Sequence, residues 1–281
     1  MDISIVIRTL NESRLLNTLL QSISTQNLTG KSLEIFIVDS GSVDGTLELA
    51  VRHNCRILKI KQEDFSFGRS LNLGCMNATG KILVFVSGHC LPTNNDWLQQ
   101  LILPLEIGHS KLSYGRQTAD VSTRLSEERI FSENYGLSDY TTESNYFCNN
   151  ANCAITKDVW DVLRFNEDLS GLEDLDFAKR LINLGYSVSY ASNATVIHSH
   201  LETWFQIMNR FKREAYAMNF IDSSQKIPFT QIFIDCINRI FSDFKFIRQK
   251  KSKYIFKLLL DIVGYRSAQH IGILIGHYAK F

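Results

Sequence analysis

The stretch LEIFIVDSGSVDGTLELAVRH, residues 33–53, contains one complete strand, turn and helix. Residues 33–39 are a mostly apolar run of the kind that forms a buried strand, and the run ends in Asp39. A glycine-containing turn follows, in which Ser42 or Asp44 can cap the next helix. Because open α/β sheets bind ligands at the carboxyl ends of their strands, Asp39 stands at a candidate ligand site.

The same alternation runs through the first hundred residues. Further strands are predicted at ISIVI (3–7), CRILKI (55–60) and KILVFV (81–86). Helices are predicted at SRLLNTLLQSIS (13–24), with Ser13 or Asn11 as its cap, and at FSFGRSLNLGCMN (65–77). Alternation of this kind predicts an α/β fold with a mainly parallel central sheet and right-handed crossovers.

The pattern loosens after residue 100. Its clearest element is an amphipathic helix over residues 174–186, which Gly185 ends and a strand at 187–191 follows. Residues 121–147 are polar and aromatic and predict no clear element, whereas helices rich in Phe, Ile and basic residues are expected after Thr203. We therefore expect a main domain over residues 1–224 and a basic amphipathic helical extension over residues 225–281.

Composition describes an ordinary globular protein. The 281 residues are 44% hydrophobic and 21% charged, with a net charge of +1, so the chain can bury a substantial core. The six cysteines are scattered without a C-x-x-C pair, and the N-terminus has no basic, apolar signal segment, which indicates reduced thiols and a cytoplasmic location. We find no run of 18 apolar residues, so no membrane-spanning helix is expected.

Charge is distributed unevenly along the chain. From Lys226 onward there are ten Lys and Arg residues against three acids, so the tail carries about +7 and the rest about −6. Neither G-x-G-x-x-G nor G-x-x-x-x-G-K-[ST] occurs, which disfavours a standard dinucleotide or P-loop site. The acidic first part and the lack of a recognition motif make nucleic acid an unexpected partner.

Two polar sites precede residue 80. Asp39 can accept hydrogen bonds from a nucleobase or ribose, or it can simply cap the following helix. Arg69 and Asn72 lie on one face of a predicted helix, where the guanidinium suits a base or a phosphate. A solvated surface arginine is the plainer alternative.

Further candidates lie later in the chain. Glu173 and Asp174 begin a helix, where they can serve as ordinary helix-start acids or as a general base. His198 and His200 follow a strand and, together with His89, raise the possibility of a metal site, although their spacing alone is weak evidence.

Taken in order, these motifs resemble the family 2 glycosyltransferases with the GT-A fold. The matching stretches cover residues 3–200 and are ISIVIRTLNE, IVDSGSVDGT, FSFGRSLNLG, ILVFVSGHCLPTNNDWL, FCNNANCAITKDVW and GLEDLDFAKRLINLGYSVSYASNATVIHSH. Within the family, the forms VDSGS, F-x-x-G-R-x-x-N, N-x-N-x-A and H-S-H are most similar to rhamnosyltransferase-like enzymes of bacterial surface-polysaccharide assembly. The resemblance implies a nucleotide-sugar-binding half over residues 1–100 and an acceptor half over residues 101–224.

The resemblance also implies inverting transfer of a sugar from a nucleotide-sugar donor to an acceptor hydroxyl. Asp174 is then the base, and Glu173 orients it or the acceptor. The residues expected on the nucleotide side are Thr9, Glu12, Asp39, Arg69, Asn72 and Ser87. The residues expected on the acceptor side are Asn152, His200 and Arg180, of which Arg180 has bracing the fold as its alternative.

One departure from the family pattern concerns the metal. Most relatives carry an acidic D-x-D-like triplet whose last aspartate helps to bind Mg²⁺ or Mn²⁺, and this chain has Ser87-Gly88-His89. Three accounts of His89 remain open: it binds a divalent cation such as Mn²⁺ together with His198, it donates a hydrogen bond to the leaving phosphate without metal, or the protein is an inactive nucleotide-sugar-binding or scaffold homologue.

The basic C-terminal segment is a candidate for contact with a membrane surface. Phe and Ile interleave there with Lys245, Arg248, Lys250, Lys251, Lys253 and Lys257. This composition suits an anionic membrane surface, although an ordinary packed helix pair with a solvated basic face is the alternative. The expected enzyme is cytoplasmic, peripheral at the inner face of the plasma membrane, and extends a lipid-linked glycan of O-antigen or capsule with rhamnose as the candidate sugar. A nucleoside monophosphate sugar is the alternative donor.

Overall fold

The computed structural model describes residues 1–222, 227–250 and 255–279, without the side chains of residues 248–250 and 255. It divides the chain into two compact units, each of which is described by itself. The first unit comprises Met1–Thr118, Tyr135–Leu169 and Glu173–His198. The second unit comprises Ala119–Asn134, Ser170–Leu172 and Ser199–Phe281.

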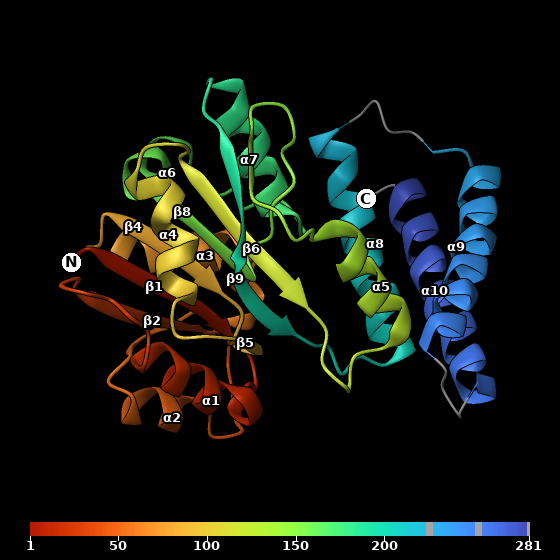
Figure 1. Cartoon of the computed structure of the whole chain (residues 1–281), viewed down its shortest axis with the longest axis horizontal. Helices are drawn as coiled ribbons and strands as arrows, with labels where there is room; N and C mark the ends of the chain where they lie inside the picture. Colours follow the sequence, from red (N-terminus) through yellow and green to blue (C-terminus); the bar gives the residue numbers. More distant parts are fainter. Residues whose placement is uncertain (223–226, 251–254, 280–281) are drawn as a thin grey trace. The chain divides into compact units, whose positions relative to one another are not determined.

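A nine-stranded sheet forms the centre of the first unit (Figure 1). Its strands are β1 (Ile3–Thr9), β2 (Leu33–Asp39), β3 (Arg56–Lys59), β4 (Ile82–Val86), β5 (Cys90–Pro92), β6 (Leu112–Thr118), β7 (Tyr140–Thr142), β8 (Asn152–Thr156) and β9 (Val188–His198). The strand order is β3-β2-β1-β4-β8-β6-β9-β5, and β7 pairs with β9.

The sheet is parallel in its first half and mixed in its second. Strands β3, β2, β1 and β4 pair in parallel, as the alternation of strand and helix predicts. Beyond β4 the alternation stops, and β8 runs antiparallel to both β4 and β6, while β6 and β9 are parallel. The expectation of a mainly parallel sheet therefore holds for β3, β2, β1 and β4, whereas β5 runs antiparallel to β9.

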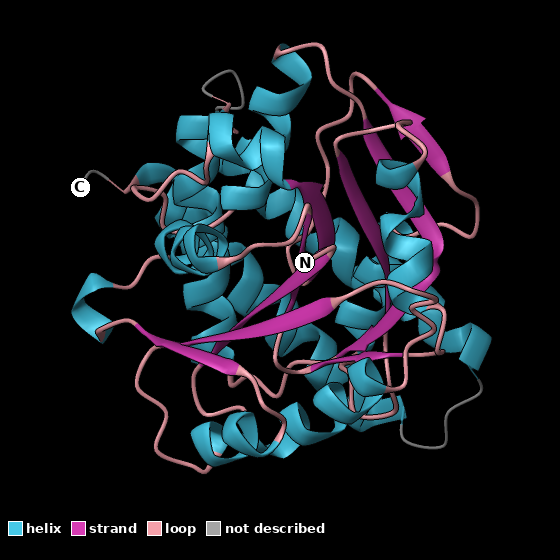
Figure 2. Ribbon diagram, turned by 90° about the vertical axis from the view of Figure 1, so that its left-hand side faces the viewer, coloured by secondary structure: helices cyan, strands magenta, loops and turns pink. Residues whose placement is uncertain are grey.

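Helices cover both faces of this sheet (Figure 2). They are α1 (Ser13–Ser24), α2 (Thr46–Arg52), the short 3₁₀ helix η1 (Gln62–Asp64), α3 (Phe67–Asn77), α4 (Trp97–Glu106), α6 (Lys157–Leu163) and α7 (Glu173–Asn183). Leucines of α1 pack in the same core as Ile3, Ile5 and Ile7 of β1. On the opposite face of β1, α3 approaches so closely that a Cβ at Gly74 would lie 2.4 Å from Cγ1 of Val6.

The loop after β2 caps two helices. The carboxylate of Asp44 accepts hydrogen bonds from the backbone N–H of Thr46 at 3.1 Å and of Ser13 at 3.0 Å. These are first-turn amides of α2 and α1, which the helices themselves cannot satisfy. The N-cap residues are Gly45, at a φ of 96°, and Glu12, so the expectation that Asn11 or Ser13 caps α1 is wrong: the oxygen comes from a distant loop.

The second unit is helical. Its helices are α5 (Leu125–Asn134), α8 (Trp204–Ile221), α9 (Phe229–Lys250) and α10 (Ile255–Tyr278). α8 packs along α10 with close backbone contact, because a Cβ at Gly272 would lie 2.3 Å from the carbonyl oxygen of Met208. The helical unit therefore starts before the boundary predicted at residue 225 and takes in α8 and α5.

A buried ion pair joins α9 and α10. Arg266 and Asp243 are both fully buried, and Nε of Arg266 lies 2.7 Å from Oδ2 of Asp243. Arg129 and Ser126 of α5 also bond to the same carboxylate. Removal of one partner from such a buried cluster is strongly destabilising, because it leaves a buried charge uncompensated.

One described helix is long and apolar enough to cross a membrane by length and composition alone. It is the Phe256–Tyr278 stretch of α10, with a mean hydropathy of 1.2. The sequence expectation of no such segment is corrected accordingly. Core helices of soluble proteins can have the same length and apolar composition. α10 buries Arg266, Gln269 and His270 on the face that packs against its neighbours.

Candidate active site

Asp39 anchors the loop that follows β2. Its carboxylate accepts from the Thr9 hydroxyl at 3.0 Å, from the hydroxyl of Ser42, and from the backbone N–H groups of Gly41 and Ser42 at 2.9 Å. Burial alone would raise the pKa of Asp39, but these hydrogen bonds outweigh it and lower the pKa. The structure thus joins the predicted pair Thr9 and Asp39 and uses the Asp39 carboxylate to hold the loop.

A buried acid pair opens α7. Glu173 accepts from Nη1 of Arg8 at 3.0 Å and from Nδ2 of Asn150 at 3.3 Å. Asp174 accepts from the backbone N–H groups of Asn150, at 3.1 Å, and Leu175, at 2.9 Å. Arg8, from the end of β1, also lies 4.8 Å from the ring centroid of Phe67. Residues from three distant parts of the chain therefore meet at the start of α7.

The two acids of this pair differ in their surroundings. Burial raises the pKa of Asp174 to about 7, and the charge of Glu173 acts in the same direction. The amide donors and the charge of Arg8 oppose this shift without cancelling it. A carboxylate with a pKa near neutral can accept a proton from an attacking hydroxyl and later release it, which is what a general base requires.

A row of four hydrogen-bonded side chains links the N-cap of α1, the turn between β4 and β5, β9 and β6. Oε1 of Glu12 lies 2.9 Å from Nδ1 of His89, and Nε2 of His89 lies 3.1 Å from Nε2 of His198. Nδ1 of His198 lies 2.7 Å from Oε1 of Gln117. The imidazole rings stack with their centroids 5.0 Å apart. The structure therefore places Glu12, which was expected on the nucleotide side, next to His89 and His198, which were expected together as metal ligands.

The positions of the protons on His89 and His198 decide how the two rings interact. When Nδ1 of each histidine donates to its oxygen, both Nε2 lone pairs face each other. An extra proton or a divalent cation between the rings removes the repulsion of these lone pairs. A neutral alternative has the Gln117 amide donating to Nδ1 of His198 and Nε2–H of His198 donating to Nε2 of His89. Histidine ligands of metals commonly donate their other N–H to a carboxylate or carbonyl oxygen, as Glu12 and Gln117 would accept here.

Arg69 and Asn72 occupy a different environment. Arg69 pairs with Glu167 at 3.0 Å and donates to the carbonyl of Asp64 at 2.8 Å. Asn72 is buried and makes four hydrogen bonds within the protein: it donates to the Phe165 carbonyl and to Glu167, and it accepts from Trp160 and from the Phe165 N–H. Its amide is fully used to tie α3 to the loop after α6, whereas Arg69 remains accessible.

Three further predicted residues also take part in packing. Asn152 is fully buried, accepts from Nε1 of Trp97 at 2.9 Å and donates to the carbonyl of Ala194 at 2.8 Å. Arg180 pairs with Asp176 on its own helix and donates to backbone carbonyls after α6, which matches its bracing alternative. Ser87 lies in the turn between β4 and β5, where its carbonyl accepts from the N–H of Cys90.

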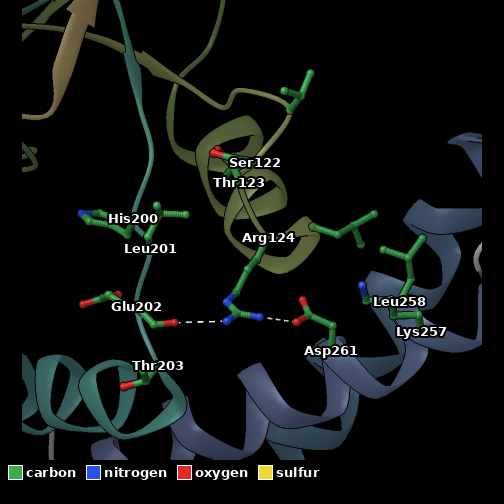
Figure 3. Close-up of a pocket in the computed structure, with 12 residues that line it drawn as sticks. Ser122, Thr123, Arg124, His200, Leu201, Glu202, Thr203, Lys257, Leu258 and Asp261 are labelled. Carbon is green, nitrogen blue, oxygen red and sulfur yellow. Dashed lines mark hydrogen bonds and ion pairs between the residues drawn. The ribbon is translucent and has the colours of Figure 1, made fainter. Parts of the chain in front are cut away.

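His200 belongs to the second unit. Nδ1 of His200 lies 2.8 Å from Oε1 of Glu127, and Arg210 pairs with Glu127 and Glu202. Next to this cluster lies a cavity of about 580 Å³. In Figure 3, Arg124 extends between Asp261 and the backbone of Glu202 along this cavity. His200 lines it, whereas Glu173, Asp174 and His89 are not among its lining residues.

Sequence reasoning missed Arg8, Asn150 and Gln117. The available indication for Arg8 was a lone charge at the end of the apolar run of β1, since an arginine in a mostly buried strand usually has an acidic partner. Asn150 lies in the quoted run FCNNANCAITKDVW, where it could not be separated from its neighbours. Gln117 offered no indication, because its role depends on the strand pairing of β6 with β9.

Comparison with known sequences gives consistent results. A family model described as "Glycosyl transferase family 2" matches residues 4–161. The chain is 26% identical over 199 residues to the O-antigen chain rhamnosyltransferase WbaN of Salmonella anatum, an alignment that covers 66% of this chain and 62% of the relative. It is 25% identical over 218 residues to the O-antigen chain rhamnosyltransferase RfbN of Salmonella typhimurium, covering 71% and 67%. The chain thus spans about two thirds of the length of these relatives.

Comparison with solved structures concerns the fold. The mannosyltransferase PcManGT from Pyrobaculum calidifontis, solved in complex with GDP-Man and Mn²⁺, superimposes with a TM-score of 0.66 at 15% identity. The match covers 98% of this chain and 87% of that one. At this identity the likeness is evidence for the fold alone, and it confirms the fold that the sequence resemblance predicted.

Proposed function

This chain belongs to the family 2 glycosyltransferases, and on that premise we propose that it transfers a sugar from a nucleotide-sugar donor to an acceptor hydroxyl, with inversion at the anomeric carbon. The observation that carries the proposal is the buried Glu173–Asp174 pair, whose second carboxyl has its pKa raised to about 7. A helix N-terminus favours an ionised carboxylate, whereas the burial of Asp174 opposes ionisation, so a helix-start role does not by itself account for this burial.

The proposed chemistry is a single displacement. The acceptor oxygen forms a bond to the anomeric carbon while the bond from that carbon to the phosphate oxygen breaks, and the nucleotide leaves with the electron pair. Asp174 takes the hydroxyl proton. Arg8 compensates the charge of Glu173, so that the ionised pair can exist in a buried site.

His89 and His198 fit a divalent cation. Two Nε2 atoms 3.1 Å apart, each on a ring whose Nδ1 faces an oxygen, form a donor pair that suits a transition-metal ion such as Mn²⁺ better than Mg²⁺. A cation held there supplies positive charge for the departing phosphate. The metal-free alternative, in which His89 is an imidazolium beside Glu12, provides positive charge at the same place.

The donor, the acceptor and the location are finer parts of the proposal. The names of the relatives, O-antigen chain rhamnosyltransferases, support rhamnose as the sugar and an O-antigen chain as the acceptor. A lipid-linked glycan of O-antigen or capsule is the acceptor that we propose. The bound GDP-Man of the mannosyltransferase supports a nucleotide-sugar donor. Such an acceptor would place the protein in the cytoplasm as a peripheral protein at the inner face of the plasma membrane. We also keep Thr9, Glu12, Asp39, Arg69 and Ser87 as the proposed nucleotide side.

A donor screen tests the proposal. The purified protein is heated with a panel of nucleotide sugars, with and without Mn²⁺, and a ligand that binds only the folded state raises the melting temperature. The donor so identified is then incubated with extracted lipid-linked glycans, and nucleotide release is measured. Acceptor-dependent release supports the transferase, whereas saturable donor binding without release would instead indicate the inactive nucleotide-sugar-binding or scaffold homologue.

A further inference from the structure

The outer faces of α9 and α10 are apolar. On α9, Phe229, Phe233, Ile237 and Phe241 follow one another at intervals of four residues, so they lie on successive turns of one face. Their side chains are between 38% and 61% exposed. The opposite face of α9 packs into the helical unit through Asp243 and Ile247. A solvent-facing helix would normally present polar residues on its outer side.

α10 repeats the arrangement. Its exposed apolar side chains lie along nearly the whole helix and are between 39% and 75% exposed: Phe256, Leu260, Val263, Ile271, Ile275 and Tyr278. Its inner face carries Ile262, Tyr265 and Arg266, which are buried. From Phe256 to Tyr278 the helix is about 33 Å long at 1.5 Å per residue. We call these two rows of side chains on α9 and α10 the apolar face.

Basic residues accompany the apolar face. Lys245 lies one turn beyond Phe241 on α9, and Lys257 lies beside Phe256 on α10, and both are exposed. The sequence from Lys226 to the end carries ten Lys and Arg residues against three acids. Arg248, Lys250, Lys251 and Lys253 contribute to this count, but their side chains lie outside the part that the structure describes.

We propose that the apolar face of α9 and α10 binds the surface of an anionic lipid bilayer, with Phe and Ile side chains in the headgroup region and Lys245 and Lys257 at the lipid phosphates. Amphipathic helices bind bilayers in this manner, with the apolar side chains buried at the boundary of headgroups and acyl chains. The inference rests on the proposed function, because a lipid-linked acceptor is available only at a membrane.

Charge decides between lipid and the other possible occupants. A second copy of the chain would bring two tails of about +7 against each other, and like charges across an interface are costly. Insertion of α10 across the bilayer would have to break the buried pair of Arg266 and Asp243 or carry it into hydrocarbon. An anionic surface satisfies both the apolar side chains and the positive charge.

The test is flotation of the full chain with lipid vesicles that contain neither acceptor nor nucleotide sugar. One set of vesicles is phosphatidylcholine with phosphatidylglycerol, and the other is phosphatidylcholine alone. We expect the protein to float with the anionic set and less with the neutral set. The double variant Phe233→Asp with Phe241→Asp should bind roughly a hundredfold more weakly, since each phenylalanine contributes about a tenfold factor when buried.

Two sets of controls make the outcome specific. Val51→Asp with Val162→Asp changes two apolar residues of the first unit that are at least as exposed as Phe233 and Phe241, and it should leave flotation unchanged. Lys245→Gln and Lys257→Gln should each weaken binding to anionic vesicles about fivefold, the equivalent of about 1 kcal/mol.

Three results would overturn the inference: no flotation of the wild type, equal flotation of the Phe233 and Phe241 variant, or attachment that resists both high salt and alkaline carbonate, which indicates a spanning helix. A dimer in light scattering that the same variant converts to monomer, without vesicle binding, would assign the face to a second copy instead. Because the vesicles carry no substrate, loss of flotation leaves sugar transfer to a water-soluble acceptor measurable, so the two proposals fail separately.

Discussion

Replacement of Arg8 by methionine isolates the electrostatic control of the acid pair. Methionine keeps most of the volume of the side chain, so the contact with Phe67 remains, but the guanidinium that lies 3.0 Å from Glu173 is lost. Glu173 then keeps Asn150 as its donor at 3.3 Å. Two buried carboxylates without a compensating cation bind a shared proton more tightly.

The magnitude follows from the geometry. Two unit charges at 3.0 Å interact by roughly 5 kcal/mol at an effective dielectric of about 20. This is an upper limit for the effect on Asp174, because Arg8 keeps some contact with solvent and its ion pair is with Glu173. We expect the apparent pKa of the pair to rise by about 1 to 2 pH units, within the range usual for a lost opposite charge.

The direction of the effect on rate is fixed by the role of the base. Asp174 accepts a proton only when ionised, so activity should rise with pH through a pKa of about 7 in the wild type. In Arg8→Met this limb moves to higher pH, so that the rate at pH 7 falls about tenfold and recovers in more alkaline buffer. Arg8→Lys keeps the charge and should lie close to the wild type.

The assay does not need the acceptor. The protein is labelled with ¹³C in the aspartate carboxyl groups, the Asp174 resonance is assigned by its absence in Asp174→Asn, and its titration is followed by NMR in each variant. A wild-type Asp174 that titrates at the ordinary value for aspartate would refute the reasoning. So would an Asp174 titration that is the same in Arg8→Met as in the wild type.

Three further predictions concern single residues. Burial opposes the ionisation of Asp174, so the protein is most stable below the unfolded pKa of about 4 and loses stability as the pH rises to about 7. Asp174→Asn should therefore raise the melting temperature at pH 8 but not at pH 4. In calorimetry the gain in unfolding free energy at pH 8 should reach up to about 4 kcal/mol. His89→Ala should abolish donor turnover while His109→Ala does not, and thorough chelation that leaves turnover intact would favour the imidazolium over the cation. Asn72→Leu should lower the unfolding free energy by about 2–4 kcal/mol in urea, because three buried groups of Trp160 and Phe165, and the half-exposed Glu167, lose their hydrogen bonds. Weaker donor binding at unchanged stability would restore Asn72 to the nucleotide side.

Local patterns predicted the first half of the fold. The apolar runs at 3–7, 33–39 and 81–86 are β1, β2 and β4, and the helix expected over residues 174–186 is α7. These elements were visible because each carries its own periodicity. The antiparallel pairing of β8 and the packing of α8 with α10 were not visible, because they depend on contacts between residues far apart in sequence.

The candidate active site was also predictable only in part from the sequence. A motif identified the pair Glu173 and Asp174, since the motif is contiguous, but the distinct surroundings of the two acids come from Arg8 and Asn150, which are distant in sequence. Asn72 shows the opposite case. Its spacing from Arg69 indicated a shared face, and only the structure shows that its amide is used internally.

The most direct measurement is the anomeric configuration and the rate of a single turnover with the donor that the screen identifies, compared between wild type and Asp174→Asn. The account predicts a product of inverted configuration from the wild type, and a rate at least a hundredfold lower in Asp174→Asn at unchanged donor affinity. A product of retained configuration, or an Asp174→Asn rate equal to that of the wild type, would contradict it.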